Sequence, residues 1–286
     1  MKERDQTYLR KPAWLRTQMT RAHDYSQMKT KLKAGGLHTI CESGACPNKG
    51  ECWSHGTATF MILGNICTRS CRFCNVQTGK PHAPDTNEPE EVANAVRSAG
   101  VKHCVITSVD RDDLPDGGAV HWAQTIRAIK KTAPQTSIEA LIPDFQGNEE
   151  AISAVMDAGP EVISHNLETV RRLTAKVRAY AAYERSLGVL DYIARQSRVR
   201  TKSGIMLGLG ETEDEILQTM DDLRKVHCQV LTIGQYLQPS RKCLPVRQYI
   251  HPDDFRRYGD IARDKGFLFV ESAPLVRSSY HAEKHV

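Results

Sequence analysis

The sequence lacks any apolar run that approaches the roughly 20 residues a helix needs to cross a membrane. It also lacks the apolar segment of a secretory signal peptide, because residues 1–6 are mostly charged. These two absences predict a protein that has no membrane partner and that is located in the cytoplasm.

Charge of one sign is present only in small excess. The chain has 39 Lys and Arg against 34 Asp and Glu, which leaves a net charge of +5 over 286 residues. The basic residues are spread along the chain, whereas binding to a nucleic-acid backbone requires a dense basic surface. We therefore expect no nucleic-acid partner, and the mild positive charge suits a mildly acidic protein partner.

Repeats, low-complexity tracts and clear linkers are also absent, and from residue 59 onward short β-branched segments alternate with amphipathic ones. This alternation predicts a parallel sheet with right-handed crossovers. We expect strands at residues 59–66, 103–109, 137–142, 161–167, 200–208 and 230–237. We expect helices at residues 88–99, 118–132, 147–158, 168–196, 212–226 and 252–265.

Six strand–helix units are too few for a complete barrel of eight. The predicted fold is therefore α/β, an open partial (β/α)6 TIM-type barrel whose mouth is wide enough for a cofactor and a substrate chain. A closing strand is expected within residues 266–276. The expected organisation is an N-terminal cysteine-rich extension at 1–58, the barrel at 59–266, and a C-terminal strand and tail at 267–286.

The nine cysteines occur without a secretory signal, which argues against disulfides and for metal or catalytic use. Six of them form two close triplets, and the other three stand singly. Cys104 begins an expected strand and Cys228 lies at the end of an expected helix, so we expect both to be buried, small apolar side chains.

The first triplet has the spacing C-x3-C-x2-C and consists of Cys67, Cys71 and Cys74. Thiolates at this density select zinc, copper(I) or an iron–sulfur cluster. A structural zinc ion needs a fourth protein ligand, and the next Cys or His along the chain is His82. The spacing favours a cubane cluster bound at three irons, with the fourth iron open to a small molecule. The alternative is a zinc ion that also uses Cys52 or His82.

The second triplet has the rarer spacing C-x4-C-x5-C and consists of Cys41, Cys46 and Cys52. Glycine and proline between the thiols predict a turning loop rather than a helix. A zinc knuckle is one interpretation of this loop. The presence of two triplets in one chain favours two iron–sulfur clusters.

At the first triplet the chain resembles radical S-adenosylmethionine (SAM) enzymes. Their signature is C-x3-C-x2-C with an aromatic residue just before the last cysteine, which is Phe73 here. Residues 204–211 also resemble the G-x-I-x-G-x-x-E strand of these enzymes, with Met206 at the usual Ile. The resemblance implies that the first triplet holds a 4Fe-4S cluster whose open iron chelates the amino and carboxylate groups of SAM.

The same resemblance suggests where the rest of SAM is bound. Ser108 follows the second expected strand, where these enzymes contact the SAM amino group, and Asn166 and Glu168 end the fourth strand and could contact the ribose or the methionine moiety. Gly208 is expected to let the backbone approach the ligand closely. His165, also at a strand end, could touch the site, but a structural histidine with satisfied hydrogen bonds is the favoured interpretation.

Over nearly the whole chain the sequence resembles the lipoyl synthases. The shared segments are both triplets, R-K-P-x-W-L at 10–15, G-Q-Y-L-Q-P at 234–239, L-P-V at 244–246 and R-S-S-Y at 277–280. In that family the second serine of R-S-S-Y is the oxygen ligand of an auxiliary 4Fe-4S cluster. The resemblance assigns this role to Ser279, beside the second triplet. Cys243 departs from the pattern, because the family has His at this position.

The lipoyl synthase resemblance implies a function. A sulfur atom enters at carbon six and another at carbon eight of an octanoyl chain on a lysine of a lipoyl carrier domain, with one SAM consumed per hydrogen removed. Removing hydrogen from an unactivated methylene requires radical chemistry that side chains cannot supply. The auxiliary cluster is the implied sulfur donor, and Ser279 would release its iron more readily than a cysteine. The implied partners are 2-oxoacid dehydrogenase E2 subunits, the glycine cleavage H protein, and an electron donor such as ferredoxin or flavodoxin.

Two other functions remain as alternatives. A methylthiolating enzyme acting on tRNA also carries an extra cluster, but it needs a further RNA-binding domain and a dense basic surface. A two-cluster electron carrier is a second alternative. Carriers are usually compact and have every iron capped by Cys, which fits poorly with triplets and with a chain of 286 residues.

Overall fold

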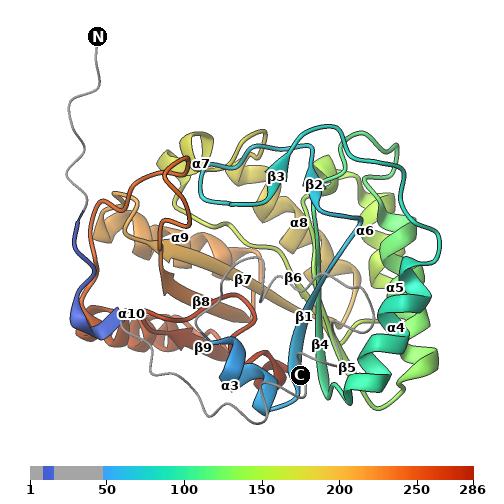
Figure 1. Cartoon of the computed structure of the whole chain (residues 1–286). Helices are drawn as coiled ribbons and strands as arrows, with labels where there is room; N and C mark the ends of the chain where they lie inside the picture. Colours follow the sequence, from blue (N-terminus) through green and yellow to red (C-terminus); the bar gives the residue numbers. More distant parts are fainter. Residues whose placement is uncertain (1–8, 16–47) are drawn as a thin grey trace.

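The computed structural model describes residues 9–15 and 48–286, and at its centre lies one parallel sheet (Figure 1). Its strands pair in the order β1-β4-β5-β6-β7-β8-β9, and every pairing is parallel. The bounds are β1 Thr57–Ile62, β4 His103–Ser108, β5 Ser137–Leu141, β6 Val162–Ser164, β7 Arg200–Leu207, β8 Val230–Gln235 and β9 Phe269–Ser272. The predicted α/β fold with a parallel sheet is confirmed. In the described part of the chain β1 and β9 are the two edges, so the sheet is open.

Helices connect successive strands and lie outside the curved sheet (Figure 1). Their bounds are α4 Glu88–Ala99, α5 Ala119–Thr132, α6 Glu149–Met156, α7 Arg171–Val177, α8 Tyr183–Gln196, α9 Glu213–Lys225 and α10 Pro252–Asp264. Several begin at clear signals. Thr212 and Glu215 form a capping box at the start of α9, and the Asn148 side chain accepts two backbone N–H groups at the start of α6.

The single helix predicted for residues 168–196 is wrong. The structure has two helices there, α7 and α8, and the chain between them leaves the helical conformation. Tyr180, between the helices, has a φ of 62°, and Glu168, before α7, has a φ of 65°. Neither glycine nor proline marks the break in the sequence. Helix propensity is a weak local preference that tertiary contacts override here.

The closing strand expected within residues 266–276 is confirmed as β9, which pairs with β8. All residues of β1 and β8 are buried, because helices cover the outer face of the sheet and side chains fill its inner face. In the described residues no helix is long and apolar enough to cross a membrane.

Since all strands are parallel, their carboxyl ends lie at one edge of the sheet, called the carboxyl edge below, and their amino ends lie at the opposite, amino edge. The cysteine loop, residues 67–74, hangs from the carboxyl edge after β1. Its base is the short parallel pair of β2 (Ile66–Cys67) and β3 (Gln77–Thr78). The remaining elements are short: η1 Ala13–Leu15, α3 Lys49–Ser54, η2 Phe145–Gly147 and η3 Ala282–His285.

Candidate active site

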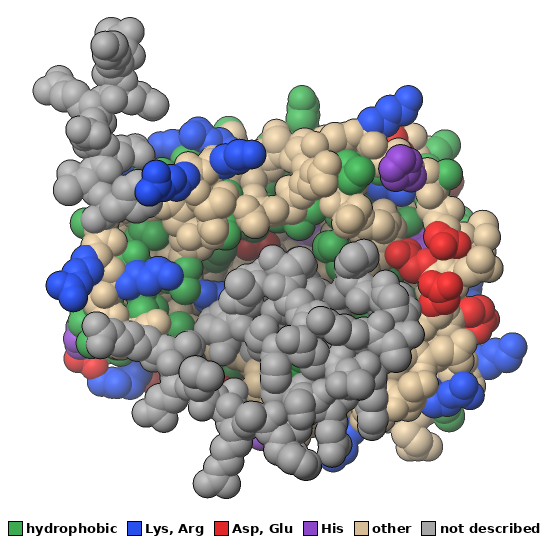
Figure 2. All heavy atoms as spheres, in the orientation of Figure 1, with side chains coloured by type: hydrophobic (Ala, Val, Ile, Leu, Met, Phe, Trp, Pro, Cys, Tyr) green, Lys and Arg blue, Asp and Glu red, His purple; other side chains and the backbone are tan. Residues whose placement is uncertain are grey.

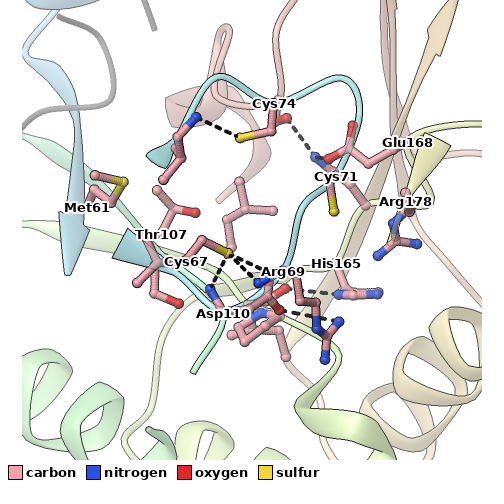
Figure 3. A pocket seen from close by; sticks show the side chains of 18 of the residues that line it. Met61, Cys67, Arg69, Cys71, Cys74, Thr107, Asp110, His165, Glu168 and Arg178 are labelled. Atoms are coloured by element: carbon pink, nitrogen blue, oxygen red, sulfur yellow. Dashed lines mark hydrogen bonds and ion pairs between the residues drawn. The ribbon is translucent and has the colours of Figure 1, made fainter. Parts of the chain in front are cut away.

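A cavity of about 380 Å³ opens at the carboxyl edge of the sheet (Figure 3). Residues from the cysteine loop, from β1, β4 and β5, from the segment after β6 and from the C-terminal tail line it. They meet because the carboxyl ends of parallel strands share one edge. The cavity brings together most of the residues selected from the sequence: Cys67, Cys71, Cys74, Ser108, Asn166, Glu168 and Ser279.

Backbone hydrogen bonds anchor the cysteine loop on three sides. The N–H of Thr68 donates to the carbonyl of Asp110 (3.1 Å), and the N–H of Arg72 donates to the carbonyl of Val177 (2.8 Å). The N–H of Leu244 in turn donates to the carbonyl of Arg72 (2.8 Å). These partners follow β4, end α7 and follow β8, so the loop is fixed by distant parts of the fold.

Backbone N–H groups point at two of the sulfur atoms. Cys67 Sγ accepts from the N–H of Arg69 (3.4 Å) and from the N–H of Asp110 (3.3 Å). Cys74 Sγ accepts from the N–H of Val76 (3.5 Å). Hydrogen bonds to sulfur favour the thiolate form and tune iron–sulfur centres.

Burial raises the pKa of the thiols of Cys67, Cys71 and Cys74 to about 11 in each case, and the Asp110 carboxylate adds to this rise at Cys67 and Cys71. The three thiols are therefore protonated at neutral pH unless a cation replaces the protons. A metal centre does this, because thiolate is the form that binds metal. Three soft thiolates with N–H donors at sulfur fit an iron–sulfur cluster.

The zinc alternative required Cys52 or His82 to join the first triplet. Neither residue lines the cavity. Within residues 9–15 and 48–286, no three Cys, His, Asp or Glu side chains are grouped so that they could hold a single metal ion. The three sulfur atoms instead lie around a shared space (Figure 3), which suits a group larger than one ion.

Arg69 stands at the centre of a buried ion-pair network beneath the cysteine loop. Its side chain is 4% exposed, and its guanidinium contacts Asp110 (3.4 Å), Asp112 (2.7 Å) and Asp144 (2.7 Å). Burial opposes ionisation of Asp144, but the hydrogen bond from Arg69 outweighs it and lowers the pKa of Asp144 to about 2. The network ties the loop to the segments that follow β4 and β5.

Asn166 and Glu168 follow β6 and line the cavity. The Asn166 amide donates to Glu168 Oε1 (3.0 Å) and to Ser278 Oγ (2.7 Å). Asn166 Oδ1, in contrast, is buried and has no hydrogen-bond partner in residues 9–15 and 48–286. Burial raises the pKa of Glu168, whose φ of 65° lies in the left-handed region. An unpaired acceptor, a desolvated carboxyl group and a strained backbone indicate a ligand site. The acceptors fit the amino group or the ribose hydroxyls of SAM.

Ser108 and Gly208 differ in their placement. Ser108 ends β4, lines the cavity and accepts a hydrogen bond from Trp122 Nε1 (3.2 Å). At Gly208, by contrast, an added Cβ would lie 2.2 Å from Gln235 Nε2 and 2.4 Å from the carbonyl of Gln248. Gly208 is therefore required for close packing inside the protein. Its predicted contact with SAM stays a prediction.

The C-terminal tail brings Ser278 and Ser279 to the cavity. The tail also packs against α3, the helix that carries Cys52. Tyr280 Oη donates to Glu51 Oε1 (3.1 Å), and the Asn48 amide donates to the carbonyl of Leu275 (2.6 Å). The segments that contain Cys52 and Ser279 are therefore neighbours. The other two members of the second triplet, Cys41 and Cys46, lie outside the described residues.

Arg178 is a cavity residue that sequence reasoning missed. It is buried at the end of α7, where it donates to Ser186 Oγ (2.8 Å). The expectation of one continuous helix over 168–196 concealed it, and no local signal marks the turn that points it inward. A buried guanidinium in the cavity provides a bidentate donor for a carboxylate.

The histidine and the two single cysteines that the sequence predicted to be structural are all buried. His165 is buried and also lines the cavity, with Nδ1 at 2.9 Å from the carbonyl of Ile142 and Nε2 at 3.0 Å from Ser186 Oγ. Both ring nitrogens are engaged as expected of a structural histidine, and that role stays a prediction. Burial lowers the pKa of His165 to about 4. Cys104 and Cys228 are fully buried, as predicted.

Cys243 lies directly beside the first triplet. Its thiol donates to the carbonyl of Cys74 (3.4 Å) and is 3.4 Å from Ser240 Oγ. The position where the chain departs from the lipoyl synthase pattern is thus in contact with the cysteine loop.

Comparison with known proteins agrees with this site. Residues 61–223 match the family model of the radical SAM superfamily. The chain is 59% identical over 279 residues to a lipoyl synthase of Parabacteroides distasonis, covering 98% of this chain and 99% of that protein. It is 55% identical over 276 residues to a mitochondrial lipoyl synthase of Nematostella vectensis, covering 96% of this chain and 95% of that protein.

A solved structure supports the fold. The FeFe-hydrogenase maturase HydG of Carboxydothermus hydrogenoformans superposes with a TM-score of 0.59 at 14% identity, covering 91% of this chain and 76% of that chain. At this identity the likeness concerns the fold alone, whereas the two lipoyl synthases are more than half identical to this chain over nearly its whole length. The chain thus belongs to the lipoyl synthase family, whose members are enzymes of the radical SAM superfamily.

Proposed function

We propose that this chain inserts one sulfur atom at carbon six and one at carbon eight of a protein-bound octanoyl chain, which gives the lipoyl cofactor. The observation that carries the proposal is the cavity that joins the first triplet to the Ser278–Ser279 pair of the tail. When bound, one cluster supplies the electron that cleaves SAM to a hydrogen-abstracting radical, and the other supplies sulfur. The protein holds the substrate carbon between these two centres and excludes other reactants.

The carboxyl-edge residues would bind the cluster and SAM. Cys67, Cys71 and Cys74 would hold three irons of a 4Fe-4S cluster and leave the fourth for the amino and carboxylate groups of SAM. Asn166 and Glu168 offer acceptors to the SAM amino group or ribose, and Ser108 offers a hydroxyl. Arg178 is suited to the methionine carboxylate because it is the kind of planar donor that pairs with a carboxylate.

The tail and the cysteine-rich extension would bind a second 4Fe-4S cluster. Its ligands would be Cys41, Cys46, Cys52 and Ser279. The contacts of Tyr280 with α3 support this assignment, since they bring the serine segment beside the helix of Cys52. Oxygen is a harder ligand than thiolate and suits iron in such a cluster less well. Ser279 therefore marks the corner at which the cluster would open as sulfur is taken.

The proposed partners follow from this chemistry. The substrate would be the octanoylated lipoyl carrier domain of a 2-oxoacid dehydrogenase E2 subunit or of the glycine cleavage H protein, and a ferredoxin or flavodoxin would supply electrons in the cytoplasm. Figure 2 shows Lys and Arg spread over much of one face of the molecule, with Asp and Glu gathered on its right side. Because this face presents both basic and acidic side chains, it suits a protein partner better than a nucleic acid, whose backbone requires a dense basic surface.

The test is anaerobic reconstitution of the clusters, followed by dithionite, SAM and an octanoylated carrier peptide. The expected products are 5′-deoxyadenosine, methionine and a lipoylated peptide, and a peptide with a free lysine serves as the control. If both clusters are intact and neither 5′-deoxyadenosine nor lipoyl product forms, the proposal fails and the electron-carrier alternative stands.

A further inference from the structure

The last described residues of the chain lie at the amino edge of the sheet, on the side opposite the cysteine loop. There η3 contacts the first residues of several strands. Thr57 Oγ1, at the start of β1, donates to Glu283 Oε2 (2.9 Å), and Arg200, at the start of β7, donates to the backbone carbonyl of His285. The ring of Phe269, at the start of β9, lies 5.8 Å from the His285 ring in an edge-on arrangement. The tail therefore closes the base of the open barrel.

The imidazole ring of His285 is buried at this base of the barrel, and its nitrogens are not hydrogen-bonded to the surrounding residues that the structure describes. His285 is 1% exposed, and neither ring nitrogen has a hydrogen-bond partner among the described residues. Within the same part of the chain, Nε2 of His103, the first residue of β4, is also buried without a partner. An imidazole that lacks an acceptor in a buried site is stable only in its neutral form.

The charged groups around His285 reinforce this preference. Arg200 and Lys202 face it from β7, and His103 and His281 face it from β4 and from the tail. The acids nearby are already engaged. Glu139 on β5 pairs with Lys202 (2.8 Å) and Glu283 accepts from Thr57. Burial, followed by the charge of Lys202, lowers the pKa of His285 to about 3.

The same tail carries the serine pair of the cavity. Only Tyr280 and His281 separate Ser279 from η3, and His281 has a φ of 50°, so the chain turns sharply there. At roughly 3.5 Å of reach per residue, the seat of η3 limits Ser279 to a small region. Release of η3 would remove this restraint while the sheet stays folded. The serine segment would then depend on individually weak hydrogen bonds, such as those of Ser278 with Asn166 (2.7 Å) and of Tyr280 with Glu51 (3.1 Å), to stay at the cavity.

We propose that η3 is a latch: neutral His285, seated at the amino edge, holds the Ser278–Ser279 segment at the cavity, and protonation of His285 releases that segment. The free imidazole has an ordinary pKa near 6.5, so the released state binds a proton that the latched state excludes. Latching is complete above about pH 6.5 and weakens by about tenfold per pH unit below it. The latch depends on the fold of the described residues and not on the identity of any cluster.

Hydrogen–deuterium exchange on the anaerobically reconstituted protein tests the latch, with amide rates corrected for intrinsic exchange. At pH 7.5 residues 282–286 are expected to be protected, and at pH 5.5 their opening equilibrium is expected to rise about tenfold. His285→Gln should remove this pH dependence, and His285→Lys should open the segment at both pH values. His251→Gln, a change at an exposed histidine of another surface, should behave like the wild type.

Three results would overturn the latch: free exchange of residues 282–286 at pH 7.5, equal protection at both pH values, or the same tenfold rise in His285→Gln. The coupling to the cavity is tested in Ser279→Ala, which removes the proposed iron ligand. In that variant residues 277–280 must lose protection at pH 5.5 together with residues 282–286. Continued protection of residues 277–280 would show that release of η3 is not coupled to the serine segment. This result would count against the coupling whether or not the proposed sulfur insertion is correct.

Discussion

The carboxyl edge and the amino edge of the same sheet leave buried polar atoms unpaired in opposite settings. At the carboxyl edge, the unpaired Asn166 Oδ1 borders a cavity of about 380 Å³ that the three thiols also line. At the amino edge, the unpaired nitrogens of His285 and His103 are covered by the tail, beside a Lys202–Glu139 pair that is fully buried. An unpaired polar atom beside a cavity can form its missing hydrogen bond with a ligand. An unpaired imidazole nitrogen that is buried under the tail instead makes the binding of the tail sensitive to protonation. We therefore assign catalysis to the carboxyl edge, and we assign stability and the proposed control of the tail to the amino edge.

The largest expected effect concerns the carboxyl edge. Cys71→Ala removes one of three ligands of the proposed SAM-binding cluster, and SAM cleavage should be abolished because no open iron remains in the cavity. Liquid chromatography of 5′-deoxyadenosine and an iron count measure this. Cys104→Ala, at a buried cysteine outside the cavity, is the matched control and should retain cleavage. Undiminished SAM cleavage in Cys71→Ala would contradict the assignment of SAM cleavage to the carboxyl edge.

Cys46→Ala should separate the two proposed clusters. SAM cleavage should remain measurable because the first triplet is intact, but the octanoyl peptide should gain no sulfur. Mass spectrometry of the peptide gives the result. A lipoylated peptide from this variant would refute the assignment of the second triplet as sulfur donor.

At the amino edge the expected effect is on stability. Lys202→Met leaves Glu139 buried without its partner 2.8 Å away, and such a loss costs about 3–5 kcal/mol. Adding Glu139→Leu should recover most of this, because an apolar pair of similar volume replaces a buried ion pair with little penalty. Urea unfolding gives both values. If Lys202→Met weakened SAM binding in fully folded protein, the division between the two edges would fail.

A smaller effect is expected from the pH dependence of stability at His165. Burial lowers its folded-state pKa to about 4, against an ordinary value near 6.5. The unfolded chain therefore binds the proton first, and the free energy of unfolding should fall by about 3 kcal/mol as pH drops from 6.5 to 4. Unfolding of cluster-free protein at several pH values measures the slope. His165→Gln should flatten that slope, and an unchanged slope would contradict the assignment.

The smallest effect is expected at Cys243, the departure from the family pattern. Its thiol donates to the backbone carbonyl of Cys74 (3.4 Å) and lies 3.4 Å from the Ser240 hydroxyl. Cys243→His introduces the residue that the lipoyl synthase resemblance leads us to expect. SAM cleavage should change by less than about threefold, because a tenfold change would need a loss of about 1.4 kcal/mol in transition-state stabilisation. A complete loss of cleavage would show that the thiol takes part in the site.

The sequence predicted the carboxyl edge far better than the amino edge. The spacing of the cysteines indicates how many thiols can bind one metal centre. Polar residues at the ends of parallel strands lie close together because those ends share one edge of the sheet, and this is why Ser108, Asn166 and Glu168 could be placed together from the sequence. Arg178 could not be predicted, because tertiary contacts break the segment at a point where the sequence has neither glycine nor proline. Gly208 illustrates a third case. A glycine in a motif shows that something lies close to the backbone, but the sequence does not show whether this is a ligand or a side chain of the protein such as Gln235.

The amino edge could not be predicted for a different reason. His285 belongs to no motif. Its surroundings are set by strand starts that lie 85 to 228 residues earlier in the sequence, since Arg200 contacts His285 itself and Thr57 contacts Glu283 of the same short helix. Composition and periodicity carry no information about such pairings. Only the fold reveals that a terminal histidine faces Lys202.

The most direct test of the account is an iron and acid-labile sulfide count on anaerobically reconstituted wild type and Cys71→Ala. Two 4Fe-4S clusters predict about eight irons and about eight sulfides per wild-type chain, and about four of each in Cys71→Ala. A wild-type chain that holds only about four irons, or zinc on the second triplet, would contradict the account because no source of inserted sulfur would remain.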